Sequence, residues 1–236
     1  MTDSEFRSDN ADFDAVYRGD GPYAAAPAPW DIGGPQPSLV PLEAAGLITG
    51  TVLDSGCGTG ENALFLADKG YDVTGVDLAP TAIRLAQEKA KRRGLDAAFE
   101  VADVFALDAY TDRFDTVIDS AVAHLFHGDQ LAAYAASLRR VCRVGGVAHV
   151  LVLSDRSAAD FQRRFAEMAA LRTDSGITAR VDAGAVVPSL TADELRAGFA
   201  EGWVTEALAE TEFRVRLPVG PGPIDVPGRL ARFRRV

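Results

Sequence analysis

Apolar residues along the chain alternate between short continuous runs and runs with helical spacing. The continuous runs have the length of strands covered on both faces of a sheet, and they span 51–54, 71–77, 97–101, 114–118 and 147–153. Helical segments separate them, with stop signals at Gly70 and Gly94, and they span 61–69, 80–93 and 130–142. This alternation predicts an α/β fold with a mainly parallel sheet, doubly wound by right-handed crossovers.

The two ends of the chain follow this pattern less regularly. There we predict helices at 11–18, 38–46, 157–171 and 191–199, and strands at 203–208 and 230–236. The helix at 157–171 carries one apolar face and leads into an irregular stretch that ends at Pro188. We treat 156–190 as a candidate helical insertion, which is either a determinant of substrate choice or a structural addition.

A proline-rich segment precedes the regular part of the chain. Residues 1–10 are polar and aperiodic, and we expect them to be frayed or disordered. The prolines of 21–37 exclude a regular helix or a central strand there. A long, stiff loop that carries Trp30 predicts a lid, although Trp30 could instead only pack the loop onto the core. We therefore divide the chain into an N-terminal helix and lid, 1–37, and a main domain, 38–236.

A glycine-rich turn follows the first strand of the main domain. The strand ends on Asp54, and three glycines follow at alternate positions, Gly56, Gly58 and Gly60. A helix begins directly after them. Glycines in a turn between a strand and a helix allow ligand atoms to lie against bare backbone at a helix N-terminus.

Charge decides between the two cofactors that use such turns. Residues 58–63 also satisfy the dinucleotide pattern, with alanine in the last position. A dinucleotide would place its pyrophosphate against the turn, where Asp54 and Glu61 would repel it. S-adenosylmethionine has no phosphate, and a carboxylate suits its ammonium and sulfonium groups. The acidic strand end therefore favours the methyl donor.

Three segments carry a family resemblance. Asp54-Ser55-Gly56-Cys57-Gly58-Thr59-Gly60 resembles the first motif of class I S-adenosylmethionine-dependent methyltransferases, while Gly75-Val76-Asp77-Leu78 and Val101-Ala102-Asp103-Val104 resemble the second and third. The resemblance is good over roughly residues 11 to 156. It implies a Rossmann-like, seven-stranded sheet whose last two strands form an antiparallel pair at one edge.

The same resemblance implies roles for the acidic strand ends. Asp54 would lie near the methionine ammonium, Asp77 would accept hydrogen bonds from both ribose hydroxyls, and Asp103 would accept one from the adenine amine. Asp119 and Ser120 would lie near the methionine moiety and the acceptor. The full set of expected cofactor-binding residues is Tyr17, Trp30, Asp54, Gly56, Cys57, Gly58, Gly60, Asn62, Asp77, Leu78, Asp103, Val104, Asp119 and Ser120.

The lid carries a second resemblance. Pro29-Trp30-Asp31 is similar to a segment of the thiopurine, thiol and halide methyltransferases and of small actinobacterial hydroxyquinolone-type methyltransferases. In those relatives the segment folds over the cofactor and shapes the acceptor pocket. An arginine is common where this chain has Gly34, so an anion contact made by that arginine is in doubt.

Methyl transfer is an in-line displacement, in which alignment and desolvation contribute most. A base is needed only when the acceptor arrives protonated. His124, after the fourth strand, matches a histidine of the actinobacterial relatives, and Ala123 beside it implies a roomy pocket. We predict His124 and Asp119 as catalytic residues, with His127 as an alternative base. Predicted acceptor-binding residues are Trp30, His124, Phe126, His127 and Phe161.

Composition limits the classes of ligand and partner that we expect. The net charge of −10 argues against nucleic acid as a ligand. The two cysteines and three histidines lack the spacing of metal ligands, so no metal is expected. The chain shows no signal peptide and no run of about 18 apolar residues, so we expect a cytoplasmic protein without membrane contact, either a monomer or a homodimer.

These patterns predict one function and leave two alternatives. We expect S-adenosylmethionine-dependent methyl transfer to a small aromatic or heteroaromatic hydroxyl. A thiol or halide acceptor is the enzymatic alternative suggested by the lid, and it would need no base. A cofactor-binding protein without catalysis is the other.

Overall fold

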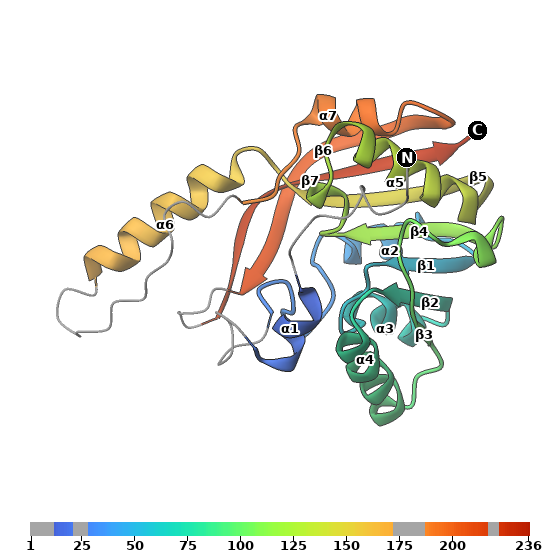
Figure 1. Ribbon diagram of the computed structural model, residues 1–236, viewed down its shortest axis with the longest axis horizontal. Coiled ribbons are helices and arrows are strands. Elements are labelled where there is room, and N and C mark those ends of the chain that lie inside the picture. Colours follow the sequence, from blue (N-terminus) through green and yellow to red (C-terminus); the bar gives the residue numbers. More distant parts are fainter. Residues whose placement is uncertain (1–11, 21–27, 172–186, 217–221) are drawn as a thin grey trace.

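The computed structural model describes residues 12–20, 28–171, 187–216 and 222–236. Seven strands form one sheet in the order β3-β2-β1-β4-β5-β7-β6 (Figure 1). Their bounds are β1 Thr51–Ser55, β2 Asp72–Asp77, β3 Ala98–Val101, β4 Phe114–Ser120, β5 Cys142–Leu153, β6 Trp203–Arg216 and β7 Pro223–Arg235. The first five strands pair in parallel, and β7 runs antiparallel to both β5 and β6. The predicted sheet and its antiparallel edge pair are confirmed.

Helices cover both faces of the sheet. Their bounds are α1 Phe13–Arg18, α2 Val40–Ala44, α3 Glu61–Asp68, α4 Pro80–Arg93, α5 Gly128–Val141, α6 Ser157–Leu171 and α7 Ala192–Gly198, with short 3-10 turns at Asp108–Tyr110 and Ala123–Leu125. Side chains of α5 and α7 pack in one apolar cluster, and those of α3 and α4 pack in another. Neighbouring residues of β1 serve opposite clusters, Val52 on one side and Leu53 on the other. This alternation is expected of a strand buried on both faces.

Three predicted boundaries were wrong. Gly145 and Gly146 lie inside β5, which begins at Cys142 rather than at the predicted Val147. A register shift between Phe114 and Thr116 on β4 accommodates the extra residues. As a result, α5 ends one residue earlier than predicted, at Val141. The helix predicted over 38–46 is reduced to the five residues of α2.

The hairpin of β6 and β7 is the largest departure from prediction, because both strands are about twice as long as expected. Pairing between β5 and β7 stops at Leu153 with Gly228, whereas pairing between β6 and β7 continues to Arg216 with Pro223. The hairpin therefore extends beyond the carboxyl end of β5. In this extension, the outer edge of β6 is free to pair with another part of the chain.

The predicted helix over 157–171 is confirmed as α6, which projects from the body of the molecule (Figure 1). Phe161 in its second turn packs beside the hairpin. Most of the irregular stretch predicted after this helix, and the frayed terminus predicted at 1–10, lie outside the described residues. The helix predicted at 191–199 is confirmed as α7, which begins with a capping box between Thr191 and Glu194.

Candidate functional site

The glycine turn is held in a conformation that requires its glycines. Gly56, Gly58 and Gly60 have φ angles of +68°, +54° and +83°, in the left-handed region. A Cβ atom on Gly56 would lie 2.1 Å from Val122 Cγ2, and one on Gly58 would lie 2.8 Å from the hydroxyl of Tyr17. The turn thus brings bare backbone against both the β4 loop and α1.

Asp54, at the end of β1, has one carboxylate oxygen without a partner. Its Oδ2 accepts a hydrogen bond from the backbone N–H of Ala63, 3.1 Å away, while the buried Oδ1 accepts none. Burial raises the pKa of this carboxyl to about 7, with a further contribution from the charge of Asp119. A buried, unsatisfied carboxylate oxygen is costly, and a cationic ligand group would satisfy it.

Asp77 joins the end of β2 to the glycine turn. Its Oδ1 accepts from Ala79 N at 2.9 Å, and its Oδ2 accepts from Gly58 N at 2.8 Å. Burial raises the pKa of this carboxyl, against the effect of these backbone donors. Asp103 lies just past the neighbouring strand β3 and accepts from Phe105 N at 3.0 Å. The acidic strand ends are therefore lined up along one edge of the sheet, as predicted.

The carboxylate of Asp119 is buried too deeply in this structure to contact an acceptor. It is completely buried, and its two oxygens accept from the backbone N–H groups of Val122 and Ala123, both at 2.9 Å. Burial raises its pKa to about 7, and a hydrogen bond from Tyr134 opposes this shift. With both oxygens engaged, Asp119 holds the turn after β4. Its neighbour Ser120 lines the cavity described next.

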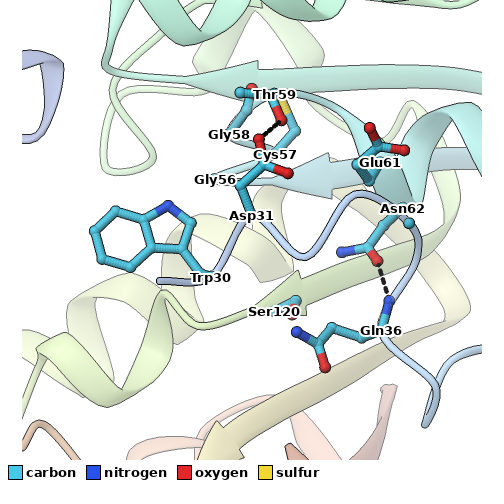
Figure 2. A pocket seen from close by; sticks show the side chains of 11 residues that line it. Trp30, Asp31, Gln36, Gly56, Cys57, Gly58, Thr59, Glu61, Asn62 and Ser120 are labelled. Atoms are coloured by element: carbon cyan, nitrogen blue, oxygen red, sulfur yellow. Dashed lines mark hydrogen bonds between the residues drawn. The ribbon is translucent and has the colours of Figure 1, made fainter. Parts of the chain in front are cut away.

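The lid contacts the glycine turn, and the two segments enclose a small cavity between them (Figure 2). Asp31 accepts a hydrogen bond from the Thr59 hydroxyl at 2.7 Å, and Gln36 N donates to Asn62 Oδ1 at 2.9 Å. The cavity is lined by Trp30, Asp31, Gly34, Gln36, Gly56, Cys57, Gly58, Thr59, Glu61, Asn62 and Ser120. Its volume of about 40 Å³ is far below the ~300 Å³ of a small-molecule site, so the cavity in this structure is too small for the cofactor.

Trp30 of the lid packs against the aromatic side chains of α1. The indole N–H of Trp30 donates to the hydroxyl of Tyr17 at 2.7 Å, and its ring meets Phe13 edge-to-face at 6.0 Å. Burial raises the pKa of Tyr17, and the charge of Asp77 adds to the shift. The structure thus brings Tyr17 and Trp30 together with Asp77 and the glycine turn.

The lid is also attached to the hairpin, which sequence reasoning missed. The side-chain amide of Gln36 accepts from Arg214 N at 3.0 Å and donates to Arg214 O at 2.8 Å, so it pairs with β6 as a strand residue would. Pro29 O accepts from Arg216 N at 2.6 Å, and the Ser38 hydroxyl donates to Glu212 O at 2.6 Å. Residues 29–38 thereby cover the outer edge of β6.

Lys89 of α4 links the lid to the core, a second contact that sequence reasoning missed. Its ammonium donates to Thr59 Oγ1 and to Glu61, each at 2.7 Å, and lies 3.5 Å from Asp31. Arg93 also bonds to Glu61, at 2.9 Å. Lys89 and Arg93 therefore neutralise the charges of Asp31 and Glu61, the two carboxylates that line the cavity. A lysine on the outer part of a helix carries no sequence signal for such a role.

His124 is in a form that cannot take a proton at Nδ1. That nitrogen accepts a hydrogen bond from Leu153 N at 3.1 Å, which leaves the ring hydrogen on Nε2. Burial lowers the pKa of His124 to about 3, and His127 contributes to the shift. This geometry speaks against the predicted role of general base, and it gives His124 one free donor, Nε2–H.

Two predicted acceptor-binding residues lie away from the cavity. Phe126 is 5% exposed and packs between Phe105 and Tyr134 in the core, with ring centroids at 4.8 and 5.3 Å. His127 faces solvent and pairs with Glu194 of α7 at 3.2 Å. Both residues follow the 3-10 turn Ala123–Leu125, and their roles in acceptor binding stay predictions. Phe161 packs against the hairpin instead.

Two negative findings apply to the described residues. No cluster of three or more histidine, cysteine, aspartate or glutamate residues there has the arrangement of a metal site. None of the helices in the same part of the chain has the length and apolar character needed to cross a membrane.

Comparisons with known proteins agree with this geometry. Residues 52–146 match the family model described as a methyltransferase domain. The chain is 40% identical over 148 residues to the 2-heptyl-1-hydroxyquinolin-4(1H)-one methyltransferase of Mycobacteroides abscessus. That match covers 62% of this chain and 65% of the relative, just under two thirds of its length.

Two further matches cover more of the protein compared. An uncharacterized methyltransferase of Schizosaccharomyces pombe is 31% identical over 112 residues, which is 48% of this chain and 77% of that one. A solved structure from work on the conversion of a disulfide bond into a thioacetal group during echinomycin biosynthesis is 54% identical. It has a TM-score of 0.84 and covers 94% of this chain and 91% of its own. The chain belongs to the class I S-adenosylmethionine-dependent methyltransferases, enzymes with a Rossmann-like fold and S-adenosylmethionine as cofactor.

Proposed function

We propose that this enzyme methylates a sulfur atom of a small acceptor that contains a disulfide bond. The observation that carries the proposal is the 54% identity to the structure associated with disulfide-to-thioacetal conversion, which extends over 94% of this chain. That match extends over almost the whole chain and covers 91% of the other protein. The match to the hydroxyquinolone methyltransferase covers only 62% of the chain.

The site has features that suit the cofactor. Asp54 Oδ1, buried and without a partner, would hold the ammonium of the methionine moiety. Asp77 would hold the ribose hydroxyls, and the glycine turn would let the cofactor lie against backbone. When bound, S-adenosylmethionine supplies a methyl group that its sulfonium already activates. The protein's part is then to align the acceptor and to exclude water.

The state of His124 favours an acceptor that needs no base. A hydroxyl has to lose its proton during methylation, and His124 Nδ1 is occupied by the Leu153 N–H. Asp119 has both oxygens bonded to backbone donors. A disulfide sulfur is neutral and has a free lone pair, so its methylation requires no proton acceptor.

Apolar side chains near His124 suit an uncharged acceptor. The His124 ring lies 6.2 Å from the ring of Phe213 on β6. Phe213 belongs to a cluster shared by the end of β5 and the hairpin, made up of Leu151, Leu153, Phe213, Val215 and Val226. Ala121 and Phe161 pack against this cluster. All five residues of the cluster are buried, so an apolar acceptor would contact them only after the residues that cover them move.

Methylation would be the first step toward a thioacetal. A methylated disulfide sulfur carries a positive charge, which acidifies the C–H bonds of the carbon attached to it. Loss of one proton to water or buffer leaves a carbanion. The second sulfur then migrates to this carbon as the S–S bond breaks, so both sulfurs end on one carbon. The net change is the addition of one methyl group and the loss of one proton.

A heteroaromatic hydroxyl is the second candidate, and the 40% identity to the hydroxyquinolone methyltransferase favours it. In that case Nε2–H of His124 would hydrogen-bond to the acceptor oxygen, and the acceptor would have to arrive ionised. A hydroxyl attached to nitrogen is more acidic than an alcohol, which makes this arrangement chemically feasible.

The experiment gives the protein and S-adenosylmethionine two acceptors in parallel, a cyclic peptide closed by a disulfide and a 1-hydroxyquinolin-4-one. S-adenosylhomocysteine release and product mass are followed. We expect turnover with the disulfide and, by NMR, one carbon bonded to both sulfurs. Turnover with the hydroxyquinolone alone would overturn the proposal in favour of the second candidate. Cofactor binding without turnover on either acceptor would also contradict it.

A further inference from the structure

Arg216, the last residue of β6, carries a guanidinium without a carboxylate partner. Its backbone N–H donates to Pro29 O at 2.6 Å, and its Nη2 lies 3.4 Å from Ile32 O, a weak contact. Its Nε is buried and makes no hydrogen bond. Within the described part of the chain, no aspartate or glutamate lies within ion-pair distance of it. Arg216 as a whole is partly exposed, so a ligand anion could reach the other nitrogens of its guanidinium.

Arg214 provides a direct contrast on the same strand. The two residues are two positions apart, so their side chains leave β6 on the same face. Arg214 binds Asp225 of β7 through two hydrogen bonds, of 2.6 and 2.7 Å. The hairpin therefore neutralises one arginine of this face and leaves the other unpaired beside the lid.

The cofactor site requires a cationic side chain, and the unpaired guanidinium of Arg216 would provide one. The amino acid moiety of S-adenosylmethionine carries a carboxylate as well as an ammonium, and Asp54 suits the ammonium only. None of the residues found to line the cavity is a lysine or an arginine, whereas Asp31 and Glu61 both line it. The nearby ammonium of Lys89 is already shared between these two carboxylates.

We propose that Arg216 binds the carboxylate of the cofactor's methionine moiety. Ile32, which Arg216 contacts, is two residues from Gly34, and Gly34 lines the cavity. A Cβ atom on Gly34 would meet nothing within 4 Å, so the space beside the lid is open there. The planar fork of a guanidinium matches the two oxygens of a carboxylate. The hairpin would thus supply a charge that the lid itself lacks.

The inference rests on the family's cofactor and not on the identity of the acceptor. It gives the long hairpin a role in cofactor binding, because Arg216 exists as a strand residue only through the extension of β6 beyond β5. It also explains how the lid and the hairpin would close together, since the same residue contacts the lid backbone and would contact the ligand.

The test uses two ligands that differ by the amino acid moiety. S-adenosylhomocysteine has the carboxylate, and 5′-methylthioadenosine lacks it. Both are titrated calorimetrically into wild type, Arg216→Met and the matched control Arg214→Met. We expect Arg216→Met to weaken S-adenosylhomocysteine binding by about tenfold or more, with less than about a twofold change for 5′-methylthioadenosine. Arg214→Met should change the affinities for both ligands by a similar factor.

Several results would overturn the assignment. An unchanged affinity of Arg216→Met for S-adenosylhomocysteine would exclude the ion pair. An equal loss for both ligands would show that Arg216 only supports the lid. Arg216→Lys separates charge from shape, and it should retain part of the preference for S-adenosylhomocysteine. Failure of wild type to bind either ligand would contradict the cofactor site itself, whatever the acceptor is.

Discussion

At the scale of single residues, the site is built from carboxylates in different environments. Asp54 and Asp119 are both buried, yet Asp119 has backbone donors on both oxygens and Asp54 has one oxygen free. Asp77 is bound to the glycine turn and to the start of α4. These differences suit a ligand cation at Asp54 and a structural role for Asp119.

The raised pKa of Asp54 makes cofactor binding depend on pH. An ammonium binds the ionised carboxylate, whose fraction grows as pH rises through about 7. We expect the affinity for S-adenosylhomocysteine to increase roughly fivefold to tenfold between pH 6 and pH 8, measured by calorimetry. Asp54→Asn should bind weakly and without this dependence, whereas Asp119→Asn should keep it. A flat profile for wild type would contradict the role of Asp54.

The same shift has the opposite sign for the stability of the ligand-free protein. Because the folded-state pKa of Asp54 lies above its unfolded value of 3.8, folding favours the protonated form. This contribution to the free energy of unfolding is complete below about pH 4 and is lost as pH rises through about 7. Asp54→Asn should therefore reduce the fall in melting temperature between pH 5.5 and 7.5 and leave the part that the equally raised pKa of Asp119 contributes.

His124 offers a test of the acceptor chemistry. In His124→Asn the new side-chain oxygen can still accept from Leu153 N, so the turn should stay folded. If the acceptor is sulfur, kcat should change by less than about fivefold, because no proton leaves during methylation. A loss of about 100-fold or more, the usual contribution of a general base, would contradict the sulfur proposal. The melting temperature of the variant serves as the control for folding.

Asp77 tests the ribose assignment. Asp77→Asn removes the charge but keeps an oxygen for one of the two backbone donors, Ala79 N or Gly58 N. We expect affinity for S-adenosylhomocysteine to fall by more than about tenfold, because charge-assisted hydrogen bonds to the diol are lost. Asp72→Asn, at the exposed start of the same strand, is the matched control and should bind as wild type does. Equal affinities of all three proteins would refute the assignment.

At the scale of elements, the lid behaves as an additional edge strand. Gln36 pairs with the backbone of Arg214 through its side chain, and Pro29 O pairs with Arg216 N. The lid also meets the glycine turn through Asp31 and through the backbone of Gln36. Cofactor release therefore requires the lid to separate from one of these two surfaces.

Removal of the Gln36 side chain should speed that release. Gln36→Ala deletes two hydrogen bonds to Arg214, and at about 1 kcal/mol each this predicts roughly tenfold faster dissociation of S-adenosylhomocysteine. Stopped-flow fluorescence can follow it, because Trp30 lines the cavity. Ser38→Ala removes the contacts of the Ser38 hydroxyl with Thr211 Oγ1 and Glu212 O, which lie outside the cavity, and should change the rate less than Gln36→Ala does. Equal rates for wild type and Gln36→Ala would show that the lid is held elsewhere.

The elements near the first strand could be predicted from the sequence, and those near the hairpin could not. Helix α4 begins at Pro80 and ends before Gly94 as predicted, because both residues act locally on the backbone. The extension of β6 has alternating exposure and no apolar run, because only one of its faces packs in a buried cluster. The contact of Gln36 with Arg214 joins residues far apart in sequence, and an amide in a proline-rich loop gives no local signal for it.

At the scale of the whole molecule, the sheet order places every acidic strand end on one side and the hairpin at the far edge. The lid crosses from the glycine turn to that hairpin, so it spans the cofactor position and the expected acceptor position. The sequence motifs predict where the cofactor half lies, because their strand ends meet at one edge of the sheet. The acceptor half depends on long-range packing of the hairpin and α6, which no local sequence pattern signals, so the roles of Phe126 and His127 stay predictions.

The most direct test of this account is a calorimetric titration of wild type with S-adenosylhomocysteine and, in parallel, with NAD. The unpaired oxygen of Asp54 and the acidic strand ends favour a ligand with an ammonium group and no phosphate. We expect micromolar binding of S-adenosylhomocysteine and no binding of NAD. Binding of NAD alone would contradict the electrostatic argument for the site and, with it, the assignment of its residues.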